Sequence, residues 1–398
     1  MRMPARPPDD GLPGTGAERE AARTFNRRYL HWDELRRRDL GGLDPAAVWL
    51  IMKSARMATC ETADVGGIRV SYNVTPRMAE TLRALDRESG RLMGEAALTE
   101  SRMEESVCSS QIEGATTETR VAMSMLREGR GPRDESERMI LNNYRAMRLA
   151  REASDEPLTP ELILGIHSAV TGVAPGEEGF RADDNVVVAD ALTGEVAHTP
   201  PPHGLVPGMV DDLCRFANSD GGTHPVVKAA VIHYMLALIH PFADGNGRTA
   251  RALFYWSALR DGYGVVDGVS LSRAIQRHRG RYDRAYLLSE TDGNDATYFA
   301  AFNLEMLAEE LGRPTVKPED GRLSALGLSE RQVAIALGME EPASVYGVSR
   351  RHGVSLNTAR SDVRLLVEKG VLEIEGRDGH RVMYRRRLES ARLQMPGT

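Results

Sequence analysis

The most informative segment of the chain reads His240-Pro-Phe-Ala-Asp-Gly-Asn-Gly-Arg-Thr-Ala-Arg251 and joins an apolar helical stretch, Pro225–Ile239, to an amphipathic one, Arg248–Leu259. Because glycine and asparagine tolerate positive φ, Gly245–Gly247 can turn successive backbone N–H groups toward one point. The following helix adds the positive end of its dipole at the same place. The segment therefore predicts an anion-binding loop that favours phosphate.

Charged side chains in the same segment indicate what the loop does with an anion. Arg248 and Arg251 lie three positions apart, so they share one helix face and can bind adjacent phosphates with planar donors. Asp244 offers a hard oxygen ligand for Mg²⁺, and His240 can accept a proton near pH 7. A lone histidine, a Gly-Asn-Gly turn or two helical arginines would each usually be structural. Their ordered combination predicts a phosphoryl-type transfer site.

The segment resembles the complete HPFx[D/E]GNGRxxR signature of Fic (Fido) proteins, adenylyltransferases that move AMP from ATP to a protein hydroxyl. Two other stretches resemble the same family: Tyr29–Arg36 is similar to its N-terminal region, and Gly179–Arg181 with the following hairpin is similar to its target-binding flap. The resemblance covers roughly the whole chain after residue 25. It implies an ATP- and Mg²⁺-dependent enzyme that modifies a Tyr, Thr or Ser hydroxyl of a protein.

The resemblance also implies a role for individual residues. His240 is the implied general base and Asp244 the Mg²⁺ ligand. ATP is bound by Gly245, Asn246 and Gly247 around the α- and β-phosphates, Arg248 on those phosphates, Arg251 on the γ-phosphate and Tyr282 on the adenine side. The family often has a Tyr-Tyr pair where this chain has Arg281-Tyr282. Its kinase branch has Lys in place of Gly247, so adenylyl transfer is favoured over phosphorylation.

A second motif, Ser109-Ser-Gln-Ile-Glu113-Gly114, ends a helical stretch at Glu95–Ile112. By itself it would be an ordinary helix end with a surface glutamate. Beside the first motif it resembles the inhibitory [S/T]xxxE[G/N] pattern of Fic proteins, which begins here at Ser109. The resemblance implies that Glu113 pairs with Arg251 and denies the γ-phosphate its partner. The same glutamate could instead orient a water that removes AMP, so a deadenylylase remains an alternative.

A short hairpin is predicted after residue 179, with strands at Asn185–Val188 and Glu195–His198 around a turn at Thr193-Gly194. Prolines that follow stop any further strand. The resemblance makes this hairpin the flap, formed by Asn185, Val186, Val187 and Val188. An exposed strand can pair with the main chain of a target and bring its hydroxyl toward His240. The alternative is an ordinary hairpin packed on the helices.

The C-terminal segment has a different charge and pattern from the rest of the chain. From Ser324 to Thr398 there are 12 Lys plus Arg against 9 Asp plus Glu, in a chain whose net charge is −6. Three helices and a hairpin are predicted, at Ser329–Leu337, Ala343–His352, Ser355–Lys369, Val371–Glu375 and Val382–Arg386. This order resembles a winged helix-turn-helix domain. Its third helix would present Asn357, Thr358, Arg360, Ser361 and Arg364 to a DNA major groove, although such domains also form homodimers and protein contacts.

The whole chain is expected to be mainly α, with a Fic/Fido helical core, a β-hairpin flap and a small winged-helix domain. Further helices are predicted at Pro45–Arg56, Arg77–Leu92, Pro160–Ala169, Val206–Asn218 and Tyr298–Leu311. The expected domains are a disordered tail at 1–20, an N-terminal helical region with the inhibitory helix at 21–150, the catalytic core at 151–312, a linker at 313–323 and the winged helix at 324–398.

Composition limits the class of protein. The chain has 398 residues, 41% hydrophobic and 27% charged, which is typical of a soluble globular protein without membrane spans. Three separated cysteines and a polar N-terminus without a secretory signal indicate a cytoplasmic location. The leading interpretation is an autoinhibited adenylyltransferase. The chief alternative is a DNA-binding regulator whose Fic site senses nucleotide or modifies the protein itself.

Overall fold

The computed structural model describes residues 3–8, 15–89, 94–174, 179–189, 194, 196–312, 326, 328–337, 339, 342–378 and 381–387. The chain divides into two compact units, Met1–Arg313 and Pro314–Thr398, each described here by itself. The predicted linker, 313–323, lies outside the described residues.

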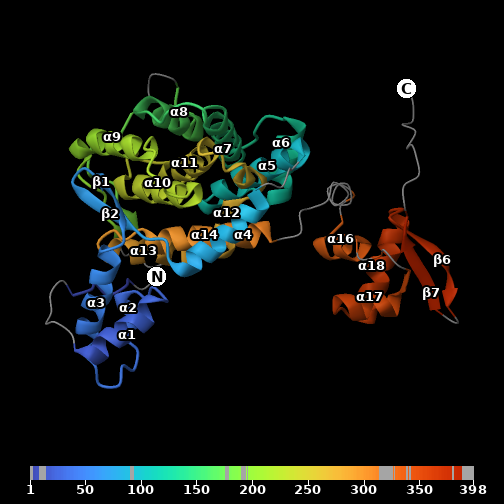
Figure 1. Cartoon of the computed structure of the whole chain (residues 1–398). Helices are drawn as coiled ribbons and strands as arrows, with labels where there is room; N and C mark the ends of the chain where they lie inside the picture. The colour runs from blue at the N-terminus through green and yellow to red at the C-terminus, as the bar shows by residue number, and fades with distance from the viewer. Residues whose placement is uncertain are drawn as a thin grey trace. The chain divides into compact units, whose positions relative to one another are not determined.

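Two helices form the centre of the first unit, α10 (Pro225–Ile239) and α11 (Asn246–Arg260). α10 is apolar on all sides and buries nearly every side chain, as expected for a helix enclosed by others. Its bounds agree with the prediction, as do those of α5. Around this pair pack α4 (Pro76–Ser89), α5 (Glu95–Ile112), α6 (Thr119–Glu128), α7 (Glu135–Glu152), α8 (Pro160–Thr171), α9 (Val206–Ala217), α12 (Leu271–Arg277), α13 (Arg279–Thr291) and α14 (Thr297–Leu311). Figure 1 shows α8 and α9 on one side of the pair and α13 and α14 on the other.

The N-terminal part of this unit has a small core of its own. It consists of α1 (Gly16–Asn26), α2 (Trp32–Leu35) and α3 (Pro45–Met57), packed around Trp49 and Met52. α1 begins with a capping box, in which Thr15 and Glu18 bond each other's backbone N–H groups. Residues 16–20 are therefore helical, and the predicted tail at 1–20 was too long.

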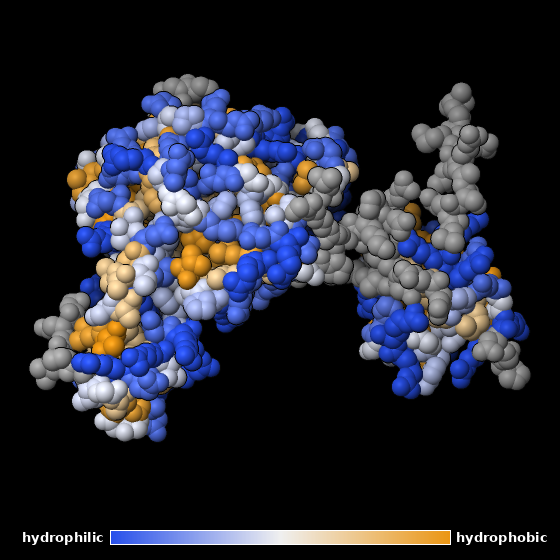
Figure 2. All heavy atoms as spheres, viewed as in Figure 1, coloured by the Kyte–Doolittle hydropathy of each residue, from blue (hydrophilic) through white to orange (hydrophobic). Residues whose placement is uncertain are grey.

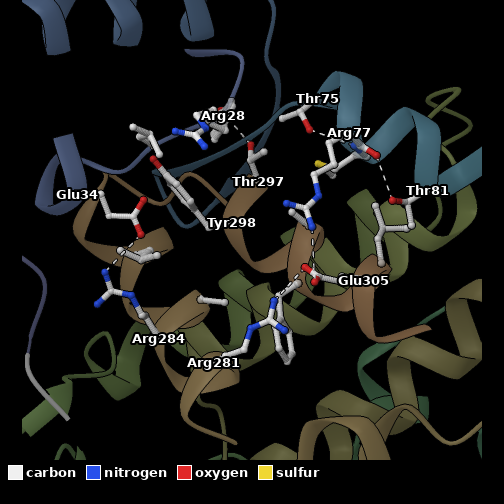
Figure 3. A pocket seen from close by; sticks show the side chains of 18 of the residues that line it. Arg28, Glu34, Thr75, Arg77, Thr81, Arg281, Arg284, Thr297, Tyr298 and Glu305 are labelled. Atoms are coloured by element: carbon white, nitrogen blue, oxygen red, sulfur yellow. Dashed lines mark hydrogen bonds and ion pairs between the residues drawn. The ribbon is translucent and has the colours of Figure 1, made fainter. Parts of the chain in front are cut away.

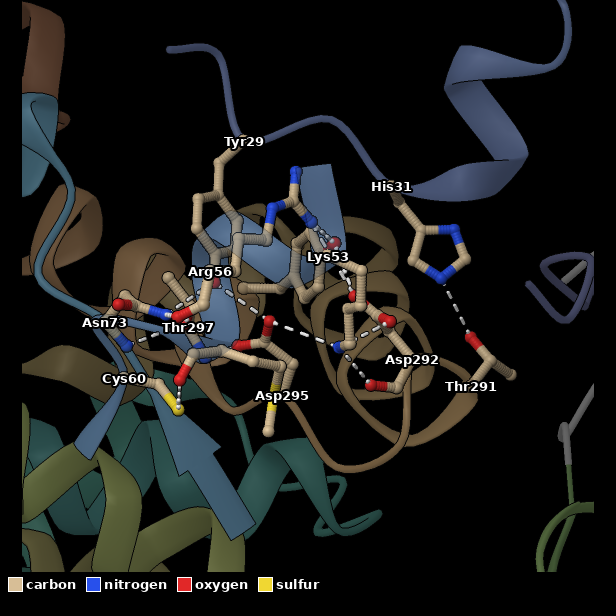
Figure 4. A network of polar contacts seen from close by, with 12 residues as sticks. Tyr29, His31, Lys53, Arg56, Cys60, Asn73, Thr291, Asp292, Asp295 and Thr297 are labelled. Atoms are coloured by element: carbon tan, nitrogen blue, oxygen red, sulfur yellow. Dashed lines mark hydrogen bonds and ion pairs between the residues drawn. The ribbon is translucent and has the colours of Figure 1, made fainter. Parts of the chain in front are cut away.

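A buried polar network attaches this N-terminal part to the loop between α13 and α14 (Figure 4). The Tyr29 hydroxyl donates to Asp295 Oδ2 at 2.9 Å, and Lys53 Nζ donates to Asp292 Oδ1 at 2.7 Å. The Arg56 guanidinium lies 3.9 Å from the centre of the Tyr29 ring. Because these groups are paired inside the protein, their burial is compensated.

A hairpin that the sequence analysis missed follows α3. Its strands, β1 (Glu61–Val65) and β2 (Ile68–Tyr72), are antiparallel. Gly66 and Gly67 between them have φ of +60° and +83°, as a type I′ hairpin turn requires. The Gly-Gly pair between two short strand-like stretches was therefore a usable signal.

The flap hairpin is present but shifted. Its strands are β3 (Val188–Ala189) and β4 (Val196–His198), so the predicted strand at Asn185–Val188 was wrong for residues 185–187. The backbone N–H of Asn185 donates to Asp183 Oδ1 at 3.0 Å, which holds a turn where a strand was expected. The predicted positions Thr193 and Glu195 lie outside the described residues.

The second unit contains α16 (Glu330–Leu337), α17 (Val345–His352) and α18 (Leu356–Glu368) around its own apolar core. A three-stranded sheet in the order β5-β7-β6 completes it, formed by β5 (Ala343–Ser344), β6 (Leu372–Asp378) and β7 (Arg381–Arg386). The helix predicted from Ala343 starts two residues later, because Ala343 and Ser344 pair with β7. The assignment as a winged helix stays a prediction.

The surface of the chain is mostly hydrophilic on the face drawn in Figure 2, with hydrophobic patches that include one on the α1–α3 part. Among the described residues, no helix is both long enough and apolar enough to cross a bilayer.

Candidate functional site

His240 ends α10 in a left-handed conformation with φ of +49°, which is uncommon for a residue other than glycine. Arg181 holds it there: its Nε donates to the His240 carbonyl at 3.0 Å, and its backbone N–H donates to the Pro241 carbonyl at 2.8 Å. Burial lowers the pKa of His240 to about 4, and the nearby His198 and Arg181 add to this effect. The imidazole is therefore neutral at pH 7 and can accept a proton.

Close packing at Gly245 and side-chain hydrogen bonds of Asn246 hold the loop after His240 in its conformation. Gly245 has φ of +82° at the start of α11, and a Cβ there would crowd side-chain atoms of Thr171 and Val170 at 3.1 and 3.2 Å. The Asn246 side chain accepts from the Phe242 backbone N–H at 3.0 Å and donates to the Phe242 carbonyl at 2.8 Å. Asn246 therefore shapes the loop with its side chain.

Arg248 lies beside Asp244 at the same helix start. Its Nη2 donates to Asp244 Oδ2 at 3.0 Å and its Nη1 to the Val170 carbonyl at 3.2 Å. Within the described part of the chain, the buried Nε of Arg248 has no hydrogen-bond partner. A buried donor without a partner is costly, so this atom fits an anion that the loop would bind.

Asp244 can take part in a metal site only with outside ligands. Its side chain is 81% exposed, and no cluster of three or more His, Cys, Asp or Glu side chains occurs among the residues that the structure describes. One carboxylate with phosphate oxygens and waters is an ordinary set of ligands for Mg²⁺. The residues present therefore fit Mg²⁺ bound together with a nucleotide.

Arg251 is fully buried and pairs with the end of α5. Its Nη2 donates to Glu113 Oε1 at 2.7 Å, and its Nε donates to Ser109 Oγ at 2.8 Å. Burial acts to raise the pKa of the Glu113 carboxyl, but the Arg251 guanidinium lowers it below its usual value. A Cβ at Gly247 would overlap Glu113 Oε1, so glycine leaves the room that this carboxylate occupies. The two motifs, 138 residues apart, thus meet at one point.

Tyr282 lies on α13 among aromatic side chains. Its ring centre is 5.6 Å from that of Phe299 and 5.9 Å from that of Phe302, and its hydroxyl lies 3.1 Å from His233 Nε2. The predicted flap residues make fewer contacts with the site than Tyr282 does. Asn185 and Val187 are exposed, and no described hydrogen bond joins Asn185–Val187 to the loop after His240.

Sequence reasoning missed two histidines at the site. The His167 ring stacks on Phe242 at 3.6 Å, and its Nε2 lies 2.9 Å from the Asp244 carbonyl. The His198 ring lies 6.4 Å from that of His240, and its Nδ1 is 2.8 Å from Glu290 Oε1. Neither belongs to a motif with a recognisable spacing, so no local signal marked them.

These features define a helical protein with a neutral histidine beside a loop whose helix start and unpaired Arg248 Nε suit an anion. Residues 157–258 match the family model described as "Fic/DOC family", and the chain therefore contains a Fic/DOC domain. It is 38% identical over 112 residues to "Protein adenylyltransferase Fic" of Drosophila sechellia, which covers 27% of this chain and 21% of that protein. Identity to the protein of the same name from Nematostella vectensis is 35% over 150 residues, or 37% of this chain and 32% of the relative.

The fold is shared more widely than the sequence. The crystal structure of a Fic family protein from Desulfovibrio desulfuricans G20 matches with a TM-score of 0.54 at 20% identity, over 81% of this chain and 99% of that one. This likeness shows a common Fic fold. The chain spans only about a fifth to a third of the length of the adenylyltransferases that it matches.

Proposed function

We propose that this protein is an adenylyltransferase that transfers AMP from ATP to a Tyr, Thr or Ser hydroxyl of a protein. One observation carries the proposal: the neutral His240 directly precedes a loop whose glycines, helix start and buried Arg248 suit the phosphates of a nucleotide. The names of the matched relatives support the same activity.

In the proposed reaction, the target hydroxyl oxygen attacks the α-phosphorus of ATP and pyrophosphate leaves. His240 accepts the hydroxyl proton, which its neutral ring allows at pH 7. Arg248 would neutralise charge on the phosphates, and Tyr282 would contact the adenine. Mg²⁺, when held by Asp244, would reduce the repulsion between the phosphates and the attacking oxygen.

The proposal includes autoinhibition by the Glu113–Arg251 ion pair, here called the brake. Arg251 would bind the γ-phosphate, but its Nη2 donates to Glu113 Oε1 at 2.7 Å and to the Ser109 carbonyl at 3.0 Å, and its Nε donates to Ser109 Oγ at 2.8 Å. ATP would then bind without this arginine in an unproductive position. Glu113 could alternatively position a water for the removal of AMP from a modified protein, and release of AMP from such a protein tests that second direction.

The flap would guide the target. β3 and β4 form a short ladder that ends at His198, whose ring faces His240 at 6.4 Å. A target segment that pairs with Val188 would bring its hydroxyl toward His240. The chain itself could be one such target.

Labelling with α-labelled ATP and Mg²⁺ tests the enzyme. Purified wild type, Glu113→Gly and Glu113→Gly/His240→Ala proteins are incubated alone and with cell lysate. We expect strong labelling by Glu113→Gly, weak labelling by the wild type and none by the double variant. A band at the mass of the chain itself reports self-modification. Equal labelling with and without His240 would reject the mechanism, and equal rates with and without Glu113 would reject the brake.

A second candidate function is DNA binding by the C-terminal unit. Asn357, Arg360, Ser361 and Arg364 are exposed on α18, while Ala359, Asp362 and Val363 between them are buried. One helix face is thus free for a major groove or for a dimer partner. Salt-dependent binding of genomic DNA fragments that weakens in Arg360→Ala/Arg364→Ala would support DNA binding. Undiminished binding by that variant would exclude this face.

A further inference from the structure

A cavity of about 590 Å³ lies in the first unit, and its lining includes no residue of the loop from His240 to Arg251. The turn after α1, the segment around α2, the start of α4, and helices α13 and α14 form its walls (Figure 3). Its volume is in the range of small-molecule sites, and Tyr298, Phe302 and Leu288 give it apolar walls.

Arginine dominates the charged lining of this cavity. Six arginines line it against two glutamates, in a chain whose net charge is negative: Arg27, Arg28, Arg38, Arg77, Arg281 and Arg284 against Glu34 and Glu305. Figure 3 shows labelled arginines reaching it from separate elements. The local excess of positive charge favours a ligand with several negative charges.

The glutamates do not neutralise this charge. Arg281 Nη2 lies 2.9 Å and Arg77 Nη2 3.6 Å from the same residue, Glu305. Arg284 Nη2 lies 3.7 Å from Glu34 Oε1 and 3.7 Å from Asp33 Oδ2, a carboxylate that Arg36 and Arg37 also share. For Arg27, Arg28 and Arg38, no ion pair occurs with any residue that the structure describes. Several guanidinium groups thus remain available for bidentate bonds to phosphate.

Helix α13 connects this cavity to the catalytic centre. Arg281 and Arg284 of α13 line the cavity, whereas Tyr282 between them is buried, with its hydroxyl 3.1 Å from His233 Nε2, and interacts electrostatically with Arg251. At one end of α13, Arg279 Nη1 donates to the Ile112 carbonyl at 3.0 Å, next to Glu113. At its other end, Glu290 bonds His198, which lies beside His240. A shift of this one helix would therefore change the contacts of the Glu113 brake, of the proposed nucleotide site and of the flap.

We propose that the arginine-lined cavity binds a small polyanion that carries several phosphate groups, and that this ligand controls the catalytic centre through α13. Such a ligand acts only if it binds one position of α13 more tightly than another. The binding site does not depend on the proposed AMP transfer, whereas its regulatory meaning rests on that function.

Calorimetry on the full chain tests the binding. The Arg248→Ala variant is used as background so that the catalytic loop does not bind the probe. Inorganic tripolyphosphate is titrated into this protein with and without Arg281→Gln/Arg284→Gln. The matched control is Arg145→Gln/Arg148→Gln, two exposed arginines with the same spacing on α7. We expect the cavity pair to weaken binding at least about tenfold and the control pair to leave it within about twofold.

Four further measurements decide the proposal. Thermal melts establish that each variant is folded. Arg77→Gln, on α4, is expected to weaken binding of tripolyphosphate, and it should leave the fold intact because the Arg77 side chain is 80% exposed. ATP in place of tripolyphosphate shows whether the phosphate chain alone or also a nucleoside is recognised, and either result supports a polyphosphate site. Binding of an oligoglutamate peptide but of neither phosphate compound would overturn the proposal in favour of a protein segment.

Amide hydrogen exchange tests the coupling without any activity assay. Tripolyphosphate should slow exchange in α13 and at the end of α5 around Ile112 in the Arg248→Ala protein. Protection confined to the cavity walls outside α13, or none, would overturn the regulatory part. Absence of AMP transfer in the labelling experiment would leave these binding and exchange results unaffected, so the two proposals fail separately.

Discussion

Gly247→Ala is expected to destabilise the first unit only while Glu113 keeps its side chain. Gly247 lies in the first turn of α11 without a positive φ, so alanine meets no backbone strain there. The new Cβ would overlap Glu113 Oε1 and lie 3.0 Å from Glu113 Cδ. The carboxylate would have to move, and its bond to Arg251 would break.

The magnitude follows from the groups that are separated. Arg251 is 1% exposed and keeps its two bonds to Ser109, while the Glu113 side chain is 33% exposed. Loss of this pair therefore costs about 1–3 kcal/mol, below the usual cost for a fully enclosed pair. Arg251 Nη1 also lies 3.2 Å from the new Cβ, but it can shift into the space that the carboxylate leaves. Without the carboxylate, alanine in a helix therefore stabilises by about 0.5–1 kcal/mol relative to glycine. The coupling energy between the two positions should be about 1–3 kcal/mol.

Urea unfolding of the wild type, Gly247→Ala, Glu113→Ala and the double variant measures this coupling. All three tryptophans, Trp32, Trp49 and Trp256, belong to the first unit, so their fluorescence reports on it alone. The double variant should be at least as stable as Glu113→Ala. Glu113→Gln is the control, because it keeps the volume that alanine at 247 must displace. An equal effect of Gly247→Ala in the wild-type and Glu113→Ala backgrounds would refute the reasoning.

Three other outcomes are expected. Burial lowers the pKa of His233 to about 3, so below about pH 6.5 the unfolded chain binds a proton that the folded chain excludes. The free energy of unfolding should therefore fall by about 2 kcal/mol between pH 7 and pH 5 because of His233 alone. An unchanged pH dependence of urea unfolding in His233→Gln would contradict this. Glu105→Ala should destabilise the first unit by about 3 kcal/mol in the same assay, because Glu105 accepts buried bonds from Tyr255, Ser270 and Ser272; a loss below about 1 kcal/mol would argue against a paired network. Arg181→Ala removes the bonds to the carbonyls of His240 and Pro201, so amide exchange in β4 should speed up at least tenfold, whereas unchanged exchange would mean that other contacts hold the flap.

The parts of the fold that the sequence predicted are those in which one local pattern is sufficient. α10 is recognisable because its apolar run is bounded by Pro225 and His240, and the loop after it because its chemistry is contiguous. The β1–β2 hairpin also depends on a local pattern, since Gly66-Gly67 fits a two-residue turn. It was missed because short strands of mixed polarity give a weak signal.

The parts that could not be predicted depend on contacts between distant segments. His198 reaches His240 only because its Nε2 lies 2.9 Å from the Leu238 carbonyl and its Nδ1 meets Glu290. Asn246 is predicted to bind ATP, and that prediction did not include the role of its side chain, which closes the loop onto Phe242, a detail that depends on side-chain direction. The flap strand began later than expected because Asp183 forms a turn with Asn185.

The contacts of α5 indicate which part of the proposed brake can move. Along its length this helix is held by Arg102, which pairs with Asp267 at 2.7 Å, by Glu104, which pairs with Arg273 at 2.6 Å, and by the buried Glu105. Displacing the helix would break all of these pairs at once. Glu113, in contrast, is the residue that caps the helix, and Gly114 behind it has φ of +101°. Rotation of one partly exposed side chain breaks a single ion pair, so release of Arg251 needs far less free energy than movement of α5. A regulator of this site should therefore act on the end of the helix, where Arg279 of α13 already bonds the Ile112 carbonyl.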